Sequence, residues 1–107
     1  MRVELLFADG DPAAMPARQN LVEVLTEDAF ETPIQMIAVA SESDAELLGM
    51  HGSPTIRIDG VDIDPDWDGP IGVAPRTYGT DSTPVPDKPL IRRAVERARG
   101  WGHGRRG

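Results

Sequence analysis

The sequence of 107 residues contains no cysteine. This absence excludes thiol–disulfide exchange, a cysteine nucleophile and thiolate metal sites, and it leaves the fold without disulfide support. The sequence also lacks any apolar run near the roughly 20 residues that a membrane-spanning helix needs. Its first residues, Met1–Glu4, place an acid inside the first apolar run and show no cleavage pattern of small residues. We therefore expect no signal peptide, no membrane partner and a cytoplasmic location.

Positive charge is scarce except at the C-terminal end. The net charge is −7, yet the chain from Lys88 onward holds seven basic residues and one acid, Glu96. Nucleic-acid binding requires a cationic surface, so the acidic body predicts no nucleic-acid partner. The basic end is either a solvated helix face with a tail or a surface for an acidic partner.

The pattern of apolar residues predicts a single α/β domain over residues 1–99, followed by a Gly/Arg-rich tail at 100–107. Strands are expected at 2–7, 34–39, 55–58 and 61–63, and helices at 13–28, 42–49 and 87–99. The strand at 34–39 is almost continuously apolar, which favours a strand covered on both faces. Residues 64–86 are rich in Asp, Pro, Gly and Thr, and we expect them to be irregular.

Local signals set the ends of these elements. Asp11 and Pro12 are a typical N-cap and first residue for the first helix, although Pro16 could move its start toward Met15. Ser41 and Ser43 both offer caps for the second helix, and Ser43 with Glu46 fits a capping box. Asp59-Gly60 predicts a hairpin between the last two strands. The resulting order is β-α-β-α-β-β-α, with a central mixed four-stranded sheet flanked by helices, a parallel first βαβ unit and an antiparallel final strand pair.

Two segments resemble the small bacterial thioredoxin-like proteins. Residues 5–14, with Asp9-Gly10-Asp11-Pro12, are similar to that family's first strand and active-site turn, where Asp-Gly-Cys-Pro is common. Residues 52–60, with Gly52-Ser53-Pro54-Thr55, are similar to its cis-proline loop and hairpin. Asp11 stands at the position of the nucleophilic cysteine and Ala14 at that of the second one, so the redox activity of the family does not carry over.

The resemblance implies a thioredoxin fold in which the Ser53–Pro54 bond is cis, beside the start of the first helix. It implies a non-redox module that holds a peptide, a protein partner or a small ligand in the groove at this junction. The chain also keeps Arg76-Thr77-Tyr78, where the family often has an Arg-x-Tyr stretch. The predicted ligand-binding residues are Asp11, Pro12, Ala13, Ala14, Met15, Ser53, Pro54, Thr55, Arg76 and Tyr78.

Three other interpretations of the sequence stay open. Asp11 could be a general acid or base, with Arg76 holding an anion, or it could be only a helix cap. Asp64, Asp66 and Asp68 match the opening of a calcium loop, but the position of its bidentate glutamate is Pro75, so only a weak cation site is conceivable. The chain could also self-associate as a homodimer or scaffold. No cofactor is expected.

Overall fold

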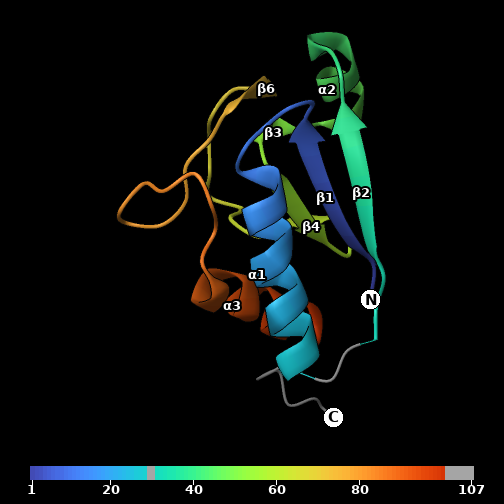
Figure 1. The fold of residues 1–107 in the computed structure, drawn as a ribbon, viewed down its shortest axis with the longest axis vertical. Coiled ribbons are helices and arrows are strands. Elements are labelled where there is room, and N and C mark those ends of the chain that lie inside the picture. The colour runs from blue at the N-terminus through green and yellow to red at the C-terminus, as the bar shows by residue number, and fades with distance from the viewer. Residues whose placement is uncertain (29–30, 101–107) are drawn as a thin grey trace.

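The computed structural model describes residues 1–28 and 31–100, which form a mixed α/β fold with a four-stranded mixed sheet and three helices (Figure 1). The elements are β1 (Val3–Ala8), α1 (Ala14–Glu27), β2 (Ile34–Val39), α2 (Glu42–Leu48), β3 (His51–Ser53), β4 (Thr55–Ile58), β5 (Val61–Asp62), β6 (Gly72–Pro75) and α3 (Lys88–Ala98). The α/β class and the mixed four-stranded sheet are therefore as predicted. The predicted tail lies outside the described residues, except for Gly100.

The main sheet has the order β2-β1-β4-β5. β1 and β2 are parallel, β4 is antiparallel to β1, and β5 is antiparallel to β4. The predicted parallel first unit and antiparallel final pair are thus confirmed. β1 lies between β2 and β4 and is therefore an interior strand of the sheet.

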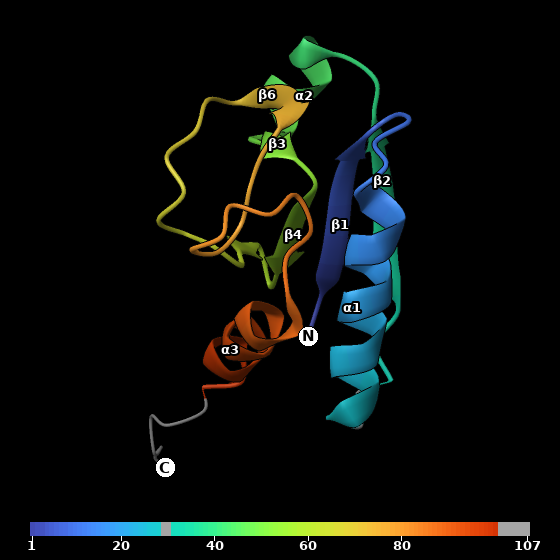
Figure 2. The ribbon, with the colours of Figure 1, turned by 60° about the vertical axis from the view of Figure 1, so that its left-hand side comes forward.

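Side chains of β1 alternate between two apolar clusters, as the twofold period of a strand requires. Val3 and Leu5 join the larger cluster with α1 and α3, whereas Leu6 joins a smaller one with Ala45 of α2 and Met50. Figure 2 shows α1 lying along β1 and β2. The predicted stripe of α1 is confirmed, because Ala14, Ala17, Leu21, Val24 and Leu25 are all buried.

The start of α1 differs from the prediction. Asp11 is not its N-cap: the helix begins at Ala14, and the capping residue, Ala13, makes no side-chain cap hydrogen bond. Pro16 lies in the first turn, where backbone N–H groups have no partner within the helix, so its missing N–H costs little there. Asp11 instead ends a tight turn, with its N–H donating to the Ala8 carbonyl at 3.0 Å.

Two short strands lie where the sequence predicted none: β3 directly before Pro54, and β6 within residues 64–86. β6 pairs in parallel with β3, and together they form a two-stranded sheet that the sequence did not predict. Both strands are short and contain glycine, so no twofold apolar pattern marked them. Their strand character comes from pairing between segments about twenty residues apart.

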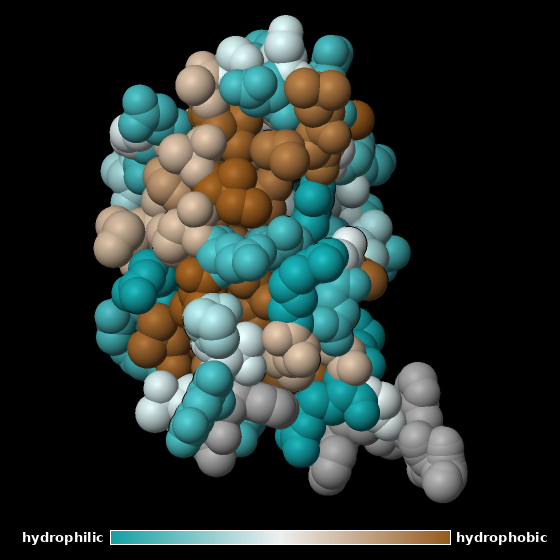
Figure 3. Space-filling model, turned by 90° about the vertical axis from the view of Figure 1, so that its right-hand side faces the viewer, coloured by the Kyte–Doolittle hydropathy of each residue, from teal (hydrophilic) through white to brown (hydrophobic). Residues whose placement is uncertain are grey.

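β2 is an edge strand of the main sheet, although its apolar run predicted a strand covered on both faces. Only Val39 is buried, and the exposures of the other five residues are intermediate or high. Figure 3 shows hydrophobic surface gathered on the side of the molecule that carries β2 and α2. An apolar run therefore did not distinguish an interior strand from an open edge here.

The cap of α2 gives a first testable prediction. Of the two candidate caps, Ser41 and Ser43, the N-cap is Ser41, and its Oγ accepts a hydrogen bond from the Asp44 N–H at 3.1 Å. We expect Ser41→Ala to lower the free energy of unfolding by about 1 kcal/mol, because an N–H at the helix start loses its acceptor. Ser43→Ala is the matched control and should change it by less than about 0.5 kcal/mol in urea unfolding. A larger loss for Ser43→Ala would contradict the observed cap.

Candidate binding site around Ser53 and Arg76

Asp11 and Ser53 join the start of α1 to the loop before Pro54. The Ser53 hydroxyl donates a short hydrogen bond to Asp11 Oδ2 and accepts one from the Ala8 N–H at 2.8 Å. Asp11 Oδ1 accepts from the Ala13 N–H at 2.9 Å. The Ser53–Pro54 bond is cis, the geometry that the resemblance implied. Both oxygens of the Asp11 carboxylate are therefore engaged inside the protein, where they hold this junction together.

β6 occupies the backbone edge of the cis-proline loop. The Arg76 N–H donates to the Ser53 carbonyl at 3.0 Å, and the Gly72 N–H donates to the Met50 carbonyl at 2.8 Å. Ser53 is 3% exposed, and Pro54 and Thr55 are buried. The Ser53 carbonyl, beside which the resemblance implied a ligand groove, is thus already paired with the chain's own segment.

Gly52 permits the close approach of β3 and β6, and sequence reasoning did not single it out. Its φ is +91°, and a Cβ at this position would lie 2.9 Å from the Cβ of Arg76 and 3.1 Å from the Ala74 carbonyl oxygen. A side chain there would force the two strands apart. A glycine within a strand is a recognised sign of close backbone contact, but the sequence did not predict β3, so this signal could not be used.

Arg76 is buried at the centre of the site, with 1% of its surface exposed. Its Nη1 donates to Asp62 Oδ2 at 2.8 Å and to Thr55 Oγ1 at 3.2 Å. The guanidinium carbon lies 5.2 Å from the ring centre of Trp67 and 4.5 Å from that of Tyr78. The guanidinium is covered and already paired with Asp62, so it is not presented to an anion at the surface. Arg76 thus pairs with an aspartate of the chain itself.

Trp67 and His51 attach the acidic loop to β3. The indole N–H of Trp67 donates to the His51 carbonyl at 3.1 Å, and His51 Nδ1 lies 2.8 Å from the Gly69 carbonyl oxygen. A carbonyl oxygen only accepts, so this contact requires a proton on Nδ1 of His51. The loop that precedes β6 is therefore bound to the strand with which β6 pairs.

Tyr78 closes the inner side of the site. Its hydroxyl donates a short hydrogen bond to the Pro54 carbonyl, and its backbone N–H donates to the Thr83 carbonyl at 2.7 Å. Burial raises the pKa of the phenol well above its ordinary value of 10.0, although the neighbouring Arg76 charge opposes this shift. Tyr78 is therefore a neutral hydrogen-bond donor at neutral pH.

The predicted ligand-binding residues come together, but most of them face inward. Ala13, Ala14, Ser53, Pro54, Thr55, Arg76 and Tyr78 are buried, Asp11 is half-buried, and Pro12 and Met15 are exposed. Met15 is 61% exposed. On the other side of Ser53, Ala74 and Pro75 of β6 are also exposed. An incoming molecule would meet this rim and not the buried floor.

The aspartates of the acidic loop do not converge on a common point. Across the part of the chain that the structure describes, no three Asp, Glu or His side chains lie close enough together to share a metal ion. Asp64, Asp66 and Asp68 therefore lack the clustered oxygen ligands that Ca²⁺ requires. Their turn has its own internal bonding, since the Trp67 N–H donates to the Asp64 carbonyl at 3.1 Å.

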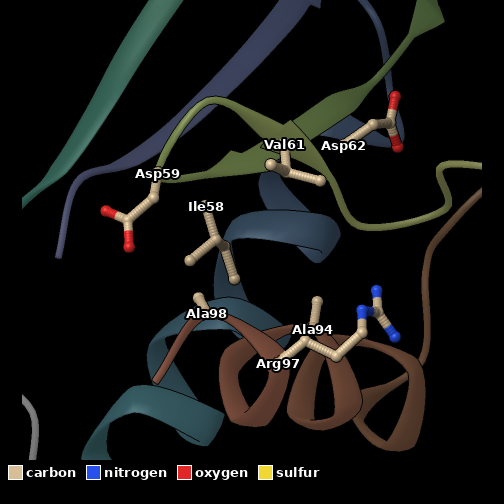
Figure 4. Close-up of a pocket in the computed structure, with 7 residues that line it drawn as sticks. All are labelled: Ile58, Asp59, Val61, Asp62, Ala94, Arg97 and Ala98. Atoms are coloured by element: carbon tan, nitrogen blue, oxygen red, sulfur yellow. The ribbon is translucent and has the colours of Figure 1, made fainter. Parts of the chain in front are cut away.

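A separate hollow of about 250 Å³ lies between the β4–β5 hairpin and α3 (Figure 4). Ile58, Val61, Ala94 and Ala98 give it an apolar lining. Each charged group at its rim has an internal partner: Asp59 accepts from the Arg2 N–H, Asp62 from Arg76, and Arg97 donates to the Ile63 carbonyl. Ligand pockets usually measure about 300–1,000 Å³, so we assign no ligand to this hollow.

Comparison with known proteins gives no relative for this chain: no protein-family model, no curated protein and no solved structure matches it. Among the helices of residues 1–28 and 31–100, none combines the length and the hydropathy of a membrane-spanning segment. The functional argument therefore depends on the geometry of the site.

The buried ion pair gives a second prediction. Arg76→Met keeps a long apolar side chain but leaves Asp62 without its cation, and we expect it to lower the free energy of unfolding by about 3–5 kcal/mol. The control is Arg93→Met, at an exposed position of α3. It should change stability by less than about 0.5 kcal/mol. Equal stability of the two variants in guanidinium unfolding would show that Arg76 does not organise the site.

Tyr78 gives a third prediction, on pH. It is the only tyrosine, so the near-ultraviolet absorbance of phenolate reports this residue alone. Its raised pKa means that the folded state keeps the proton where the unfolded state loses it. The resulting stability is present below about pH 10 and is lost as the pH rises above it. We expect no phenolate signal from the folded protein at about pH 10. Phenolate formation there without unfolding would contradict the burial.

Tyr78→Phe separates this effect from other alkaline titrations. The hydrogen bond that the Lys88 ammonium donates to Glu23 also raises the pKa of Lys88, and this contribution is the same in both proteins. The decline of unfolding free energy with rising pH should therefore be shallower in Tyr78→Phe than in the wild type.

Proposed function

We propose that this chain is a non-redox, thioredoxin-like binding module that holds a protein partner on the surface around the start of α1. The sheet order β2-β1-β4-β5, with its parallel first pair and antiparallel later pairs, supports the proposed architecture. The cis bond before Pro54, next to the turn that contains Asp11, is in the position that the resemblance requires. The absence of cysteine makes the module non-redox.

The observation that carries this proposal is the internal pairing of Ser53. Its carbonyl accepts from Arg76 and its hydroxyl donates to Asp11, so an extended peptide has no strand edge to pair with at this loop. What remains open is the rim formed by Pro12, Met15, Ala74 and Pro75, which we call the Met15 surface. Binding there uses side-chain contact, which suits a folded protein better than a strand.

The chemistry of the Met15 surface indicates the kind of partner. Methionine is flexible and adapts to irregular apolar shapes, and it is enriched at protein interfaces. The two prolines and Ala74 add apolar contact area at little cost in side-chain entropy. Asp9 is exposed and Asp11 half-buried beside them, and both carry negative charge. A partner with an apolar projection next to a basic side chain fits this arrangement.

The enzymatic alternative has weaker support. An acid or base at Asp11 would need a carboxylate oxygen directed at substrate, but Oδ1 and Oδ2 both accept internal hydrogen bonds. The proposed anion holder, Arg76, is covered and paired with Asp62. The same contacts give Asp11 a sufficient structural role without any chemistry.

A photo-cross-linking experiment tests the binding surface. A photoreactive phenylalanine analogue replaces Met15 in one sample and Val61 in the other. Val61 is the control because it is 55% exposed and lies on the edge strand β5, away from the Met15 surface. In cells of the source organism, we expect a discrete cross-linked partner from position 15 alone. Pro75→Arg should remove it, because the long charged side chain obstructs the surface.

Three outcomes would contradict the proposed function. These are no adduct from position 15, the same adducts from both positions, or an adduct that persists unchanged in Pro75→Arg. Circular dichroism of each variant controls for folding, because Pro75 is exposed and its substitution should leave the spectrum unchanged.

A further inference from the structure

Methionine supplies the only sulfur atoms of this chain. The sequence contains four methionines and no cysteine, so no thiol of the chain competes with their thioethers for an oxidant. Oxidation converts the apolar thioether to a polar sulfoxide, and methionine sulfoxide reductases reverse the change. An oxidant reacts only with a sulfur atom that it can reach, so the exposure of each methionine decides which one is modified.

The fold shields the methionines of its core. Met50 is 0% exposed within the smaller apolar cluster, and Met36 is half-buried against the larger one. Met1 is 41% exposed, but it precedes β1, at the end of that strand away from the start of α1 (Figure 1). Met15 is 61% exposed, the most of the four. It is therefore the methionine most accessible to an oxidant, and it lies on the surface proposed for recognition.

Met15 can be modified without disturbing the fold. Neither apolar cluster of the described residues contains it, and the buried face of α1 is made by other side chains. The adjacent junction is held by hydrogen bonds of Asp11 and Ser53, which do not involve the side chain of Met15. A sulfoxide oxygen at this position would face solvent and be hydrated. Its oxidation therefore changes a surface and leaves the core intact.

We propose that oxidation of Met15 by hydrogen peroxide releases the partner from the Met15 surface. This inference rests on the proposed function, because it concerns the regulation of the same surface. A lone pair of the Met15 sulfur attacks one peroxide oxygen, so that an S–O bond forms as the O–O bond breaks. Sulfur loses two electrons, the proton of the transferred oxygen passes to the departing hydroxide, and water leaves.

The reverse reaction needs an external reductant, because this chain has no thiol. A methionine sulfoxide reductase removes the sulfoxide oxygen as water while two thiols are oxidised to a disulfide. The modification is thus reversible, as a regulatory switch requires.

The sulfoxide weakens binding because the Met15 surface offers it no obvious donor. Pro12 and Pro75 of this surface have no backbone N–H, and the methyl group of Ala74 cannot donate. A partner seated here would cover the sulfoxide oxygen and take it out of water without a hydrogen bond, which costs binding free energy. We expect the dissociation constant to rise about tenfold or more.

Peptide mapping by mass spectrometry tests the selectivity of the reaction. Purified protein is exposed to hydrogen peroxide, and the sulfoxide fraction of each methionine is followed in time. Met15 should be oxidised several-fold faster than Met36 and Met50, with no change in the circular dichroism spectrum or the midpoint of urea unfolding. Oxidation of Met50 as fast as Met15, or unfolding that accompanies oxidation of Met15, would overturn the proposal.

A photo-cross-linker at Gln19 tests the release, because this position leaves Met15 in place. Gln19 is exposed and lies one turn after Met15 on the same side of α1. The protein is oxidised, freed of peroxide and then mixed with a lysate of the source organism, so that the partner itself meets no oxidant. The adduct of the untreated protein should fall about tenfold or more on oxidation. It should return after treatment with methionine sulfoxide reductase and a thiol.

The other methionines provide the controls. Met36→Leu preserves apolar volume and removes a thioether away from the Met15 surface, so its adduct should respond to peroxide as that of the wild type does. In the time course, the loss of adduct should follow the sulfoxide fraction of Met15. A loss that follows the fraction of Met1 instead, or that Met36→Leu prevents, would overturn the proposal.

The remaining outcomes separate this inference from the proposed function. An adduct that persists when Met15 is fully oxidised overturns the inference and leaves the proposed function standing. No adduct from position 19 of the untreated protein also overturns it, because a partner on the Met15 surface lies within reach of a residue one turn away. The proposed function is judged by position 15 of protein that has not been oxidised.

Discussion

The buried guanidinium of Arg76 is the constraint on which the second half of the fold depends. A charge that is 1% exposed must find its partners inside the protein, because an uncompensated buried ion is strongly destabilising. Asp62 supplies the opposite charge, Thr55 a hydroxyl, and Trp67 and Tyr78 two aromatic rings. Thr55 and Asp62 belong to the β4–β5 hairpin, whereas Trp67 precedes β6 and Tyr78 follows it. The contacts of this one side chain therefore hold the segment after β5 against the hairpin.

The position of β6 determines what the site can do. Once Arg76 is fixed, its N–H reaches the Ser53 carbonyl, and Gly52 allows the two strands to touch. Asp11 then completes the junction from the side of α1 through the Ser53 hydroxyl. The junction is held by hydrogen bonds and an ion pair, without a reactive group directed outward. The surface that remains available for recognition at this junction is the Met15 surface, formed by the start of α1 and by β6.

The sequence predicted those features that depend on local periodicity. The strands at 34–39 and 55–58 and the stripe from Ala14 to Leu25 are observed as expected, because side-chain spacing determines them. β3 and β6 were missed because each exists only through the other. The same limit applies to the site: motifs identified Asp11, Ser53, Arg76 and Tyr78 correctly as neighbours, but whether they line a groove or fill it depends on packing with a distant segment. The edge position of β2 likewise depends on the order of strands, which an apolar run does not encode.

Amide hydrogen exchange at Arg76 and Gly72 tests the central claim most directly, that the chain's own β6 occupies the loop before Pro54. Both N–H groups donate to backbone carbonyls of the segment Met50–Ser53. We predict that they exchange as slowly as the amides of β1, because pairing that depends on the buried Arg76 opens only when the domain unfolds. Exchange of both amides near the rate of an unstructured chain would mean that β6 leaves this loop open, and the account of the site would be wrong.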